Sequence, residues 1–202
     1  MKLYYSPGAC SFGIHVLLEE IGKPYDLEKV DFTVAAPDRP LAKLNPKSKV
    51  PTLVRDDGAV LTEYPAIAYW LARSNTDKHL FPDDLDGQAR VLEALDYCVA
   101  TLHMQGFSRM FGARRAATPA EQEAMTTQGR DIATKALARL DATLAGREYL
   151  NGTYSIADSA LCYCCNWAPL FKVELPANIA AHYARMKTRP AVQAAMTQEG
   201  LA

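Results

Sequence analysis

The sequence predicts a chain of two halves, an α/β unit followed by an all-α helical bundle. Short apolar runs separated by Pro, Gly and Asp turns fill about the first 80 residues, which is typical of strands and hairpins. Beyond residue 80 the strand signals are weak, and helix-start motifs with helical apolar spacing take their place. We therefore predict two domains, at residues 1–78 and 86–202.

The first half has the order strand, helix, strand, hairpin, helix. Leu3–Tyr5 predicts a strand, and the apolar residues from Phe12 to Ile21 predict a helix that Gly22 ends. The remaining elements expected here are a strand at 25–32, a loop at 35–49 with at most one helical turn, hairpin strands at 51–54 and 59–61 around an Asp-Asp-Gly turn, and a helix at 63–73.

Apolar residues of the second half recur at helical spacing. One long helix is predicted by the steps between Val91, Leu95, Cys98 and Leu102. Thr118-Pro119-Ala120-Glu121 is a capping box with proline at the first helical position, so a helix starts there and runs to Gly146. Ser155-Ile156-Ala157-Asp158 is a second such start, with Asp in place of the usual Glu or Gln.

Composition excludes several classes of protein. The 202 residues hold 22 Lys and Arg against 23 Asp and Glu, so no basic excess is available for nucleic acid. The longest uncharged run, 159–171, is shorter than the roughly 20 apolar residues of a membrane span. With no signal-peptide pattern either, we expect a cytoplasmic protein without a membrane partner. Its five cysteines are then expected to be thiols.

Two features carry candidate chemistry. Cys10 follows a strand and a Pro-Gly turn at the expected start of the first helix, where backbone N–H groups and the helix dipole lower a thiol pKa. The alternative is that Cys10 is a small, half-buried filler. The second feature is Val50-Pro51, where a cis peptide bond would turn the Val50 backbone toward a ligand, although only about 5–6% of such bonds are cis.

Other polar residues point to structure. Cys162 and Cys165 have a C-x-x-C spacing, but they follow the Ser155 cap inside a predicted helix and are interpreted as buried thiols. The four histidines are scattered without paired ligand spacing, so no metal site is expected. Of these, His103 lies beside the apolar stripe of the long helix and by itself is more typical of a core or boundary position.

Taken together in order, these motifs resemble the beta-class bacterial glutathione S-transferases. The residues that carry the resemblance are Met1 to Ser11 (MKLYYSPGACS), Asn45-Pro46-Lys47 leading to Val50-Pro51-Thr52-Leu53, Leu61-Thr62-Glu63, Leu102-His103, Ser155 to Asp158, and Arg189-Pro190-Ala191-Val192. The resemblance spans essentially the whole chain. It implies a thioredoxin-like N-terminal domain, an all-helical C-terminal domain that carries the electrophile side (the glutathione transferase fold), and a homodimer.

The resemblance also implies a set of site residues. Glutathione would bind the Val50 backbone beside a cis Pro51, and its γ-glutamyl carboxylate would meet Glu63 and Tyr64, with Asp96 contributed by the partner subunit. Cys10 and His103 would flank the sulfur as catalytic and glutathione-binding residues, with Tyr5 and Ser11 nearby. The apolar electrophile side would be lined by Phe107, Phe111 and Trp167.

The implied activity is transfer of glutathione, a co-substrate, to small apolar electrophiles, typically in detoxification. Hydrogen bonds from Cys10, Ser11 and His103 would favour the glutathione thiolate, which is the nucleophile. Three positions depart from the family pattern: Tyr64 replaces a small residue, residues 34–37 hold no Lys or Arg, and no proline precedes His15. Two alternatives stay open: a non-catalytic ligand-binding protein whose glutathione site Tyr64 blocks, and a Cys10-based thiol-disulfide (glutaredoxin-like) enzyme.

Overall fold

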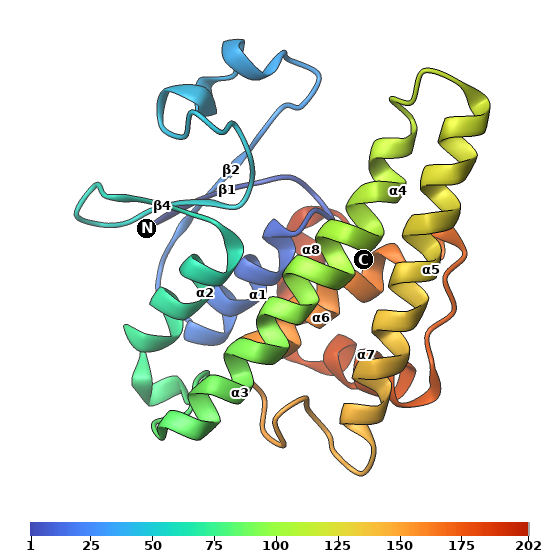
Figure 1. Ribbon diagram of the computed structural model, residues 1–202. Coiled ribbons are helices and arrows are strands. Elements are labelled where there is room, and N and C mark those ends of the chain that lie inside the picture. The colour runs from blue at the N-terminus through green and yellow to red at the C-terminus, as the bar shows by residue number, and fades with distance from the viewer. Residues whose placement is uncertain (202) are drawn as a thin grey trace. The chain divides into compact units, whose positions relative to one another are not determined.

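The computed structural model describes residues 1–201, which divide into two compact units. Of the described residues, unit one contains 1–81 and 187–201, and unit two contains Pro82–Met186. In Figure 1 the chain can be followed by colour from the blue N-terminal strand to the red C-terminal helices. The ends of the expected domains, 78 and 86, bracket the first boundary, but the last 15 described residues belong to unit one.

Unit one is built on a four-stranded mixed sheet in the order β2-β1-β3-β4. The central strand β1 pairs parallel to β2 and antiparallel to β3, and β3 and β4 form the expected hairpin. Leu3 and Leu53, which face each other in register, are both fully buried. The strands are β1 (Lys2–Tyr5), β2 (Asp26–Lys29), β3 (Thr52–Val54) and β4 (Val60–Thr62), so β2 is shorter than the expected run.

Three α-helices complete unit one: α1 (Ser11–Ile21), α2 (Tyr64–Arg73) and α8 (Pro190–Glu199). Helices α1 and α2 contact each other and lie on the same side of the sheet (Figure 1). Helix α1 ends as predicted at Gly22, whose φ of 72° is left-handed and suits glycine. The loop expected to hold at most one helical turn holds two 3₁₀ turns, η1 (Ala36–Asp38) and η2 (Pro40–Lys43), with a proline at the second position of η1 and at the first position of η2.

The C-terminal helix α8 belongs to unit one, where it packs on α1. Arg189 Nε donates to Glu20 Oε1 at 2.7 Å, and Glu199 bonds His15. The expected range 86–202 therefore extends too far for a compact unit. Periodicity shows that residues 190–199 form a helix, but it does not show which distant surface that helix covers.

Unit two is helical throughout. Its elements are α3 (Leu85–Asp96), η4 (Tyr97–Phe107), α4 (Ser108–Ala113), α5 (Pro119–Leu144), α6 (Ile156–Trp167), η5 (Pro169–Phe171) and α7 (Ala177–Thr188), the last of which continues into unit one. Where one regular helix was expected, the stretch between α3 and α4 is a π-helix, η4. Both predicted capping boxes are confirmed, at Thr118–Glu121 and at Ser155–Asp158.

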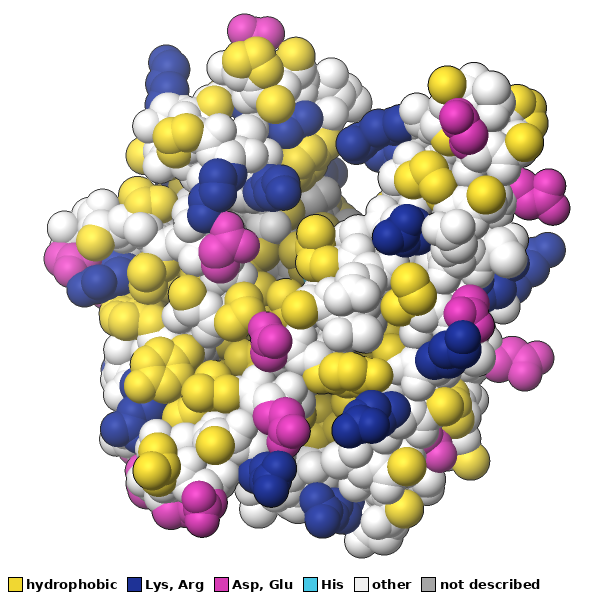
Figure 2. Space-filling model, viewed as in Figure 1, with side chains coloured by type: hydrophobic (Ala, Val, Ile, Leu, Met, Phe, Trp, Pro, Cys, Tyr) yellow, Lys and Arg dark blue, Asp and Glu magenta, His cyan; other side chains and the backbone are white. Residues whose placement is uncertain are grey.

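Three findings bear on the classes of protein that the composition excludes. No helix within residues 1–201 has the length and apolar character needed to cross a membrane. All five cysteines are thiols, as expected. On the face shown in Figure 2, basic and acidic side chains are interspersed, which agrees with the balanced charge.

Candidate active site

Cys10 and Val50 are brought together in unit one. Cys10 occupies the N-cap of α1, after a turn in which Ala9 N–H donates to Ser6 C=O at 3.0 Å. The Cys10 thiol donates to the Val50 carbonyl oxygen, with Sγ 3.4 Å from it. Two of the predicted glutathione-binding residues therefore lie in contact, although 40 positions separate them in the sequence.

The expectation that the helix start lowers the Cys10 pKa is wrong. Burial raises the pKa of the Cys10 thiol to about 12, and the nearby Glu63 carboxylate raises it further. The backbone N–H groups of Cys10 and Ser11 lower that pKa, as does Lys49, but their effect is smaller than that of burial. At neutral pH the side chain is therefore a protonated thiol that donates a hydrogen bond.

The peptide bond between Val50 and Pro51 is cis, as the resemblance implies. A set of short polar contacts holds this segment: Asn45 Nδ2 donates to the Lys49 carbonyl at 3.1 Å and to Thr52 Oγ1 at 2.9 Å. Thr52 Oγ1 in turn donates to the same Lys49 carbonyl at 2.8 Å. Asn45 and Thr52 are both buried, so the backbone of residues 49–52 is fixed.

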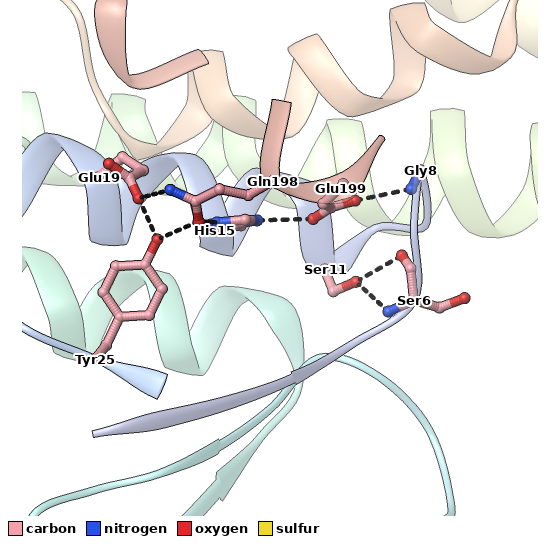
Figure 3. A network of polar contacts seen from close by, with 8 residues as sticks. All are labelled: Ser6, Gly8, Ser11, His15, Glu19, Tyr25, Gln198 and Glu199. Atoms are coloured by element: carbon pink, nitrogen blue, oxygen red, sulfur yellow. Dashed lines mark hydrogen bonds and ion pairs between the residues drawn. The ribbon is translucent and has the colours of Figure 1, made fainter. Parts of the chain in front are cut away.

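Ser11 and Tyr5 lie in the interior of unit one. Ser11 Oγ donates to the Ser6 carbonyl at 3.3 Å and accepts from Ser6 N–H at 3.2 Å (Figure 3), so its one hydroxyl proton is used within the protein. The Tyr5 ring is buried with its centroid 6.1 Å from that of His15, and burial with the Glu199 charge raises the Tyr5 pKa. Ser11 therefore offers its backbone N–H, and not its hydroxyl, to a group near Cys10.

Glu63 and Tyr64 open helix α2. Glu63 has a φ of 71° and pairs with Lys47, whose Nζ also donates to Thr62 Oγ1 at 2.6 Å. The Glu63 side chain is 66% exposed, whereas Tyr64 is only 4% exposed. The departure at position 64 thus places an aromatic ring inside the protein at a helix start, the kind of site that favours anions.

The loop that lacks a basic residue at 34–37 is held by Arg39. Its Nε donates to the Val34 carbonyl at 2.8 Å and its Nη1 to the Ser48 carbonyl at 3.2 Å. The guanidinium also lies 4.4 Å from the centre of the Phe32 ring. The Arg39 guanidinium is therefore used in contacts that stabilise the loop.

In unit two, His103 lies on the π-helix against two aromatic rings. Its Nδ1 is 3.1 Å from Tyr163 Oη, and its ring centroid is 4.8 Å from that of Trp167. The ring contact and the hydrogen bond together fix the orientation of the imidazole.

The three residues predicted for the electrophile side form one aromatic cluster with Phe171. Trp167 lies 5.7 Å from Phe107 and 5.3 Å from Phe111, and Phe111 lies 4.7 Å from Phe171 (centroid distances). Phe107 is fully buried and Trp167 is 6% exposed, so these two rings form the inner part of the cluster. Phe111 and Phe171 are half-buried. Sequence reasoning missed Phe171, which lies in the 3₁₀ turn η5 beyond the end of α6, where helical spacing gives no signal.

Asp96 lines a cavity of about 1190 Å³ in unit two, and none of the aromatic residues of that cluster lines it. Residues of α3, η4, α5 and the loop after α5 line this cavity, among them Arg90, Glu93, Tyr97 and Arg139. The Asp96 side chain is exposed. Within residues 1–201, no group of three or more His, Cys, Asp or Glu residues is arranged to hold a metal ion.

Comparisons with known proteins agree on one family. Residues 8–74 match the family model of the glutathione S-transferase N-terminal domain. The chain is 36% identical over 207 residues to glutathione S-transferase GstA of Escherichia coli O157:H7, covering 100% of both chains. The chain therefore belongs to the glutathione S-transferase family.

Solved structures extend this result to the fold. A sphingomonad glutathione S-transferase complexed with glutathione is 33% identical with a TM-score of 0.87, and 100% of each chain is covered. A bacterial beta-class glutathione S-transferase of Sphingomonas chungbukensis is 30% identical with a TM-score of 0.85, again over 100% of each chain. The predicted family resemblance and glutathione transferase fold are confirmed.

Proposed function

We propose that this chain is a glutathione transferase that joins the sulfur of glutathione to small apolar electrophiles. The observation that carries the proposal is the Cys10 thiol held against the Val50 carbonyl beside a cis Pro51, in a chain whose relatives along its full length are glutathione S-transferases. A relative of known structure holds glutathione, and we assign glutathione to this chain as its co-substrate.

Each site residue has a part in binding. The Val50 backbone pairs with the cysteinyl peptide groups of glutathione once the Cys10 thiol releases its carbonyl. The γ-glutamyl carboxylate binds the N-terminus of α2 at Glu63 and Tyr64, where backbone N–H groups favour an anion. Asp96 of the partner subunit in a homodimer holds the γ-glutamyl amino end. The residues named here bind glutathione without a Lys or Arg at 34–37, the positions where this chain departs from the family pattern.

The chemistry follows from thiol ionisation. A free thiol has a pKa near 8.5, and each unit by which the site lowers it supplies about 1.4 kcal/mol in favour of the thiolate. Cys10, as a protonated donor, and His103 stabilise the sulfur anion by hydrogen bonds. The sulfur attacks the electrophilic carbon, an S–C bond forms, the leaving group departs with its bonding pair, and the thiol proton passes to solvent.

The half-buried rings of Phe111 and Phe171 favour an apolar, aromatic electrophile. Their edge-to-face contact, with centroids 4.7 Å apart, leaves ring surface on which a flat substrate stacks. The thiol-disulfide alternative is disfavoured because attack on a disulfide requires a Cys10 thiolate, and burial raises that pKa.

Calorimetric titration of the reduced protein with glutathione, repeated on Tyr64→Ser, tests the proposal. Saturable binding by the parent, with conjugation of 1-chloro-2,4-dinitrobenzene, is the expected result. Binding only after the substitution would mean that Tyr64 closes the site, and the function would then be that of a glutathione-independent ligand-binding protein.

A mixed disulfide on Cys10 after incubation with oxidised glutathione, seen by intact mass, would support the thiol-disulfide enzyme instead.

A further inference from the structure

A buried hydroxyl contacts the His103 ring from the interior of unit two. The Nδ1 atom of His103 lies 3.1 Å from the hydroxyl oxygen of Tyr163, which is on α6. Tyr163 is fully buried, whereas His103 is half-buried. The two rings meet edge to face, with centroids 5.5 Å apart. The hydrogen bond therefore ties one nitrogen of a partly exposed imidazole to the protein core.

The backbone around His103 is held from two directions. Toward α5, a Cβ at Gly106 would lie 3.2 Å from Ala133 Cβ, so η4 and α5 are in close contact. Toward α6, the Cys164 thiol lies 3.9 Å from the Cys98 carbonyl oxygen. Because the helix is fixed in this way, the orientation of the imidazole and the place of its proton are set by the side chains that surround the ring.

Trp167 packs against both His103 and Tyr163. Its ring centroid is 5.0 Å from that of Tyr163 and 4.8 Å from that of His103. Tyr163 and Trp167 are four residues apart on α6, so they lie on the same face of that helix. The phenol and the indole therefore form one rigid wall, and the hydroxyl oxygen has a fixed place opposite Nδ1.

Acid–base chemistry decides which partner donates in the bond between Tyr163 and His103. A neutral imidazole has one N–H and one nitrogen with a lone pair, and this second nitrogen is a good acceptor because it takes a proton with a pKa of about 6.5. A phenol oxygen is a far weaker base, and its O–H is a good donor. The favoured bond runs from the hydroxyl to Nδ1, which leaves the ring proton on Nε2.

We infer that Tyr163 is a positioning residue whose hydroxyl donates to His103 Nδ1 and holds the imidazole as a donor from Nε2. The inference rests on the proposed function, in which His103 stabilises the sulfur anion of glutathione. A donor at Nε2 serves that anion without first taking up a proton, whereas the opposite tautomer would face it with a lone pair. A ring held in this way is not the base for the thiol proton, which agrees with release of that proton to solvent.

A second tyrosine supplies a matched control. Tyr163→Phe removes the hydroxyl but keeps the ring that packs on Trp167. Tyr183, on α7, donates its hydroxyl to Asn166 Oδ1 on α6 at 2.5 Å, and burial raises the pKa of this phenol to about 12. Tyr183→Phe therefore removes a hydroxyl that bonds to the same helix, but it leaves the bond at His103 Nδ1 in place.

The first measurement is the tautomer of His103 in the parent protein without substrate. Nitrogen-15 spectra of the imidazoles, assigned with His103→Gln, are recorded at a pH where the ring is neutral. We expect a proton on Nε2 and, at Nδ1, the chemical shift of a nitrogen that accepts a hydrogen bond. This acceptor shift should be lost in Tyr163→Phe and kept in Tyr183→Phe.

The second measurement is the ionisation of bound glutathione, followed by the ultraviolet absorbance of its thiolate. In Tyr163→Phe we expect the pKa of the bound thiol to rise by about one unit, because the sulfur anion loses an aligned donor. We also expect kcat at neutral pH to fall about three- to tenfold with KM for glutathione changed by less than about twofold. Tyr183→Phe should match the parent in all three values.

Three results would overturn the inference. A ring proton on Nδ1 in the parent is the first, and it needs no variant to fold. The others are a pKa of bound glutathione that is the same in Tyr163→Phe as in the parent, and an equal rise in Tyr183→Phe, which would make the effect one of general packing on α6. If the nitrogen-15 shifts follow the inference and the parent binds no glutathione, the hold on His103 stands and the proposed function fails.

Discussion

At the scale of single residues, burial decides what Cys10 does. The helix start and two backbone N–H groups favour an anion there, but the loss of water around the sulfur outweighs them, and the pKa rises to about 12. The thiol consequently donates to the Val50 carbonyl. A donor that stays protonated can stabilise a second sulfur anion, which an anionic Cys10 would repel.

This protonation state predicts how Cys10 reacts with iodoacetamide. Because the thiolate is the reacting form, the alkylation rate of the native protein should rise about tenfold per pH unit from pH 7 to beyond 9, without levelling off. Free glutathione should level off near its own pKa, about 8.5. Rates are followed by intact mass, with Cys10→Ser as the control, since the other four thiols are buried. A plateau below pH 9 would contradict the raised pKa.

The sequence predicted some site residues and missed others for physical reasons. Local motifs place Cys10 at a helix start and Pro51 at a strand start, whereas the cis bond between Val50 and Pro51 was predicted through the family resemblance. The contact between Tyr163 and His103 could not be predicted, since 60 positions separate the two residues. The pKa of Cys10 was predicted with the wrong sign because a sequence shows the helix dipole but not the depth of burial.

At the scale of elements, the start of α6 is a buried capping box. Asp158 is fully buried and accepts at both oxygens: Oδ1 from Leu150 N–H at 3.0 Å and from His182 Nε2 at 2.9 Å, and Oδ2 from Ser155 N–H at 2.9 Å. The same motif at Thr118 is exposed. One motif therefore has two different energetic roles, set by burial.

We predict that Asp158→Ala lowers the free energy of unfolding by about 3–5 kcal/mol, because it removes one partner of a buried pair and strands several donors. Thr118→Ala, at the exposed box, should cost only about 0.5–2 kcal/mol. Urea unfolding followed by circular dichroism measures both. Equal losses in the two variants would show that burial adds nothing to the box.

The close contact between α5 and the end of η4 depends on two glycines. A Cβ at Gly129 would lie 2.8 Å from the Gly106 carbonyl oxygen and 2.7 Å from Met110 Cγ, whereas a Cβ at Gly112 would lie 3.8 Å from its nearest neighbour, Met125 Cε. Gly129→Ala should therefore destabilise unit two by about 1–3 kcal/mol. Gly112→Ala should be neutral or stabilising by about 0.5–1 kcal/mol. Thermal unfolding of both variants measures these changes in stability. A Gly129→Ala variant as stable as the parent would contradict the close contact between α5 and η4.

The sequence predicted which elements form better than how they are wound. Both caps and the stop at Gly22 follow from local hydrogen bonding, and they were placed to the residue. The π-helix η4 was not predicted, because the apolar steps through Cys98 and Leu102 fit an α-helix equally well. Only the packing around these residues separates the two windings, and His103 lies on that π-helical segment.

At the scale of the whole molecule, the chain order of the elements differs from their grouping. Helix α8 is the last element, yet it joins unit one, where it holds α1 through Arg189 and Glu199. The end of the chain thereby completes the unit that its beginning starts. A truncation before residue 187 should accordingly expose the apolar surface of α1 rather than shorten unit two.

The proposed homodimer makes the strongest prediction at this scale. If Asp96 acts in the site of the partner subunit, Glu63→Ala and Asp96→Ala homodimers should each bind glutathione weakly. A heterodimer of the two variants has one site with both substitutions and one site with neither. Mixing the variants after reversible denaturation should therefore restore activity in up to half of the sites of each heterodimer.

Glutathione conjugation in the separated heterodimer, isolated by a tag on each variant, measures this restoration. Parent protein taken through the same denaturation and mixing is the control for recovery. If Asp96 instead served the site of its own chain, each site of the heterodimer would carry one substitution. Activity of the heterodimer would then stay between the low activities of the two variant homodimers. Restoration depends on which chain supplies the carboxylate, so it separates a shared site from two sites that merely lie in one dimer.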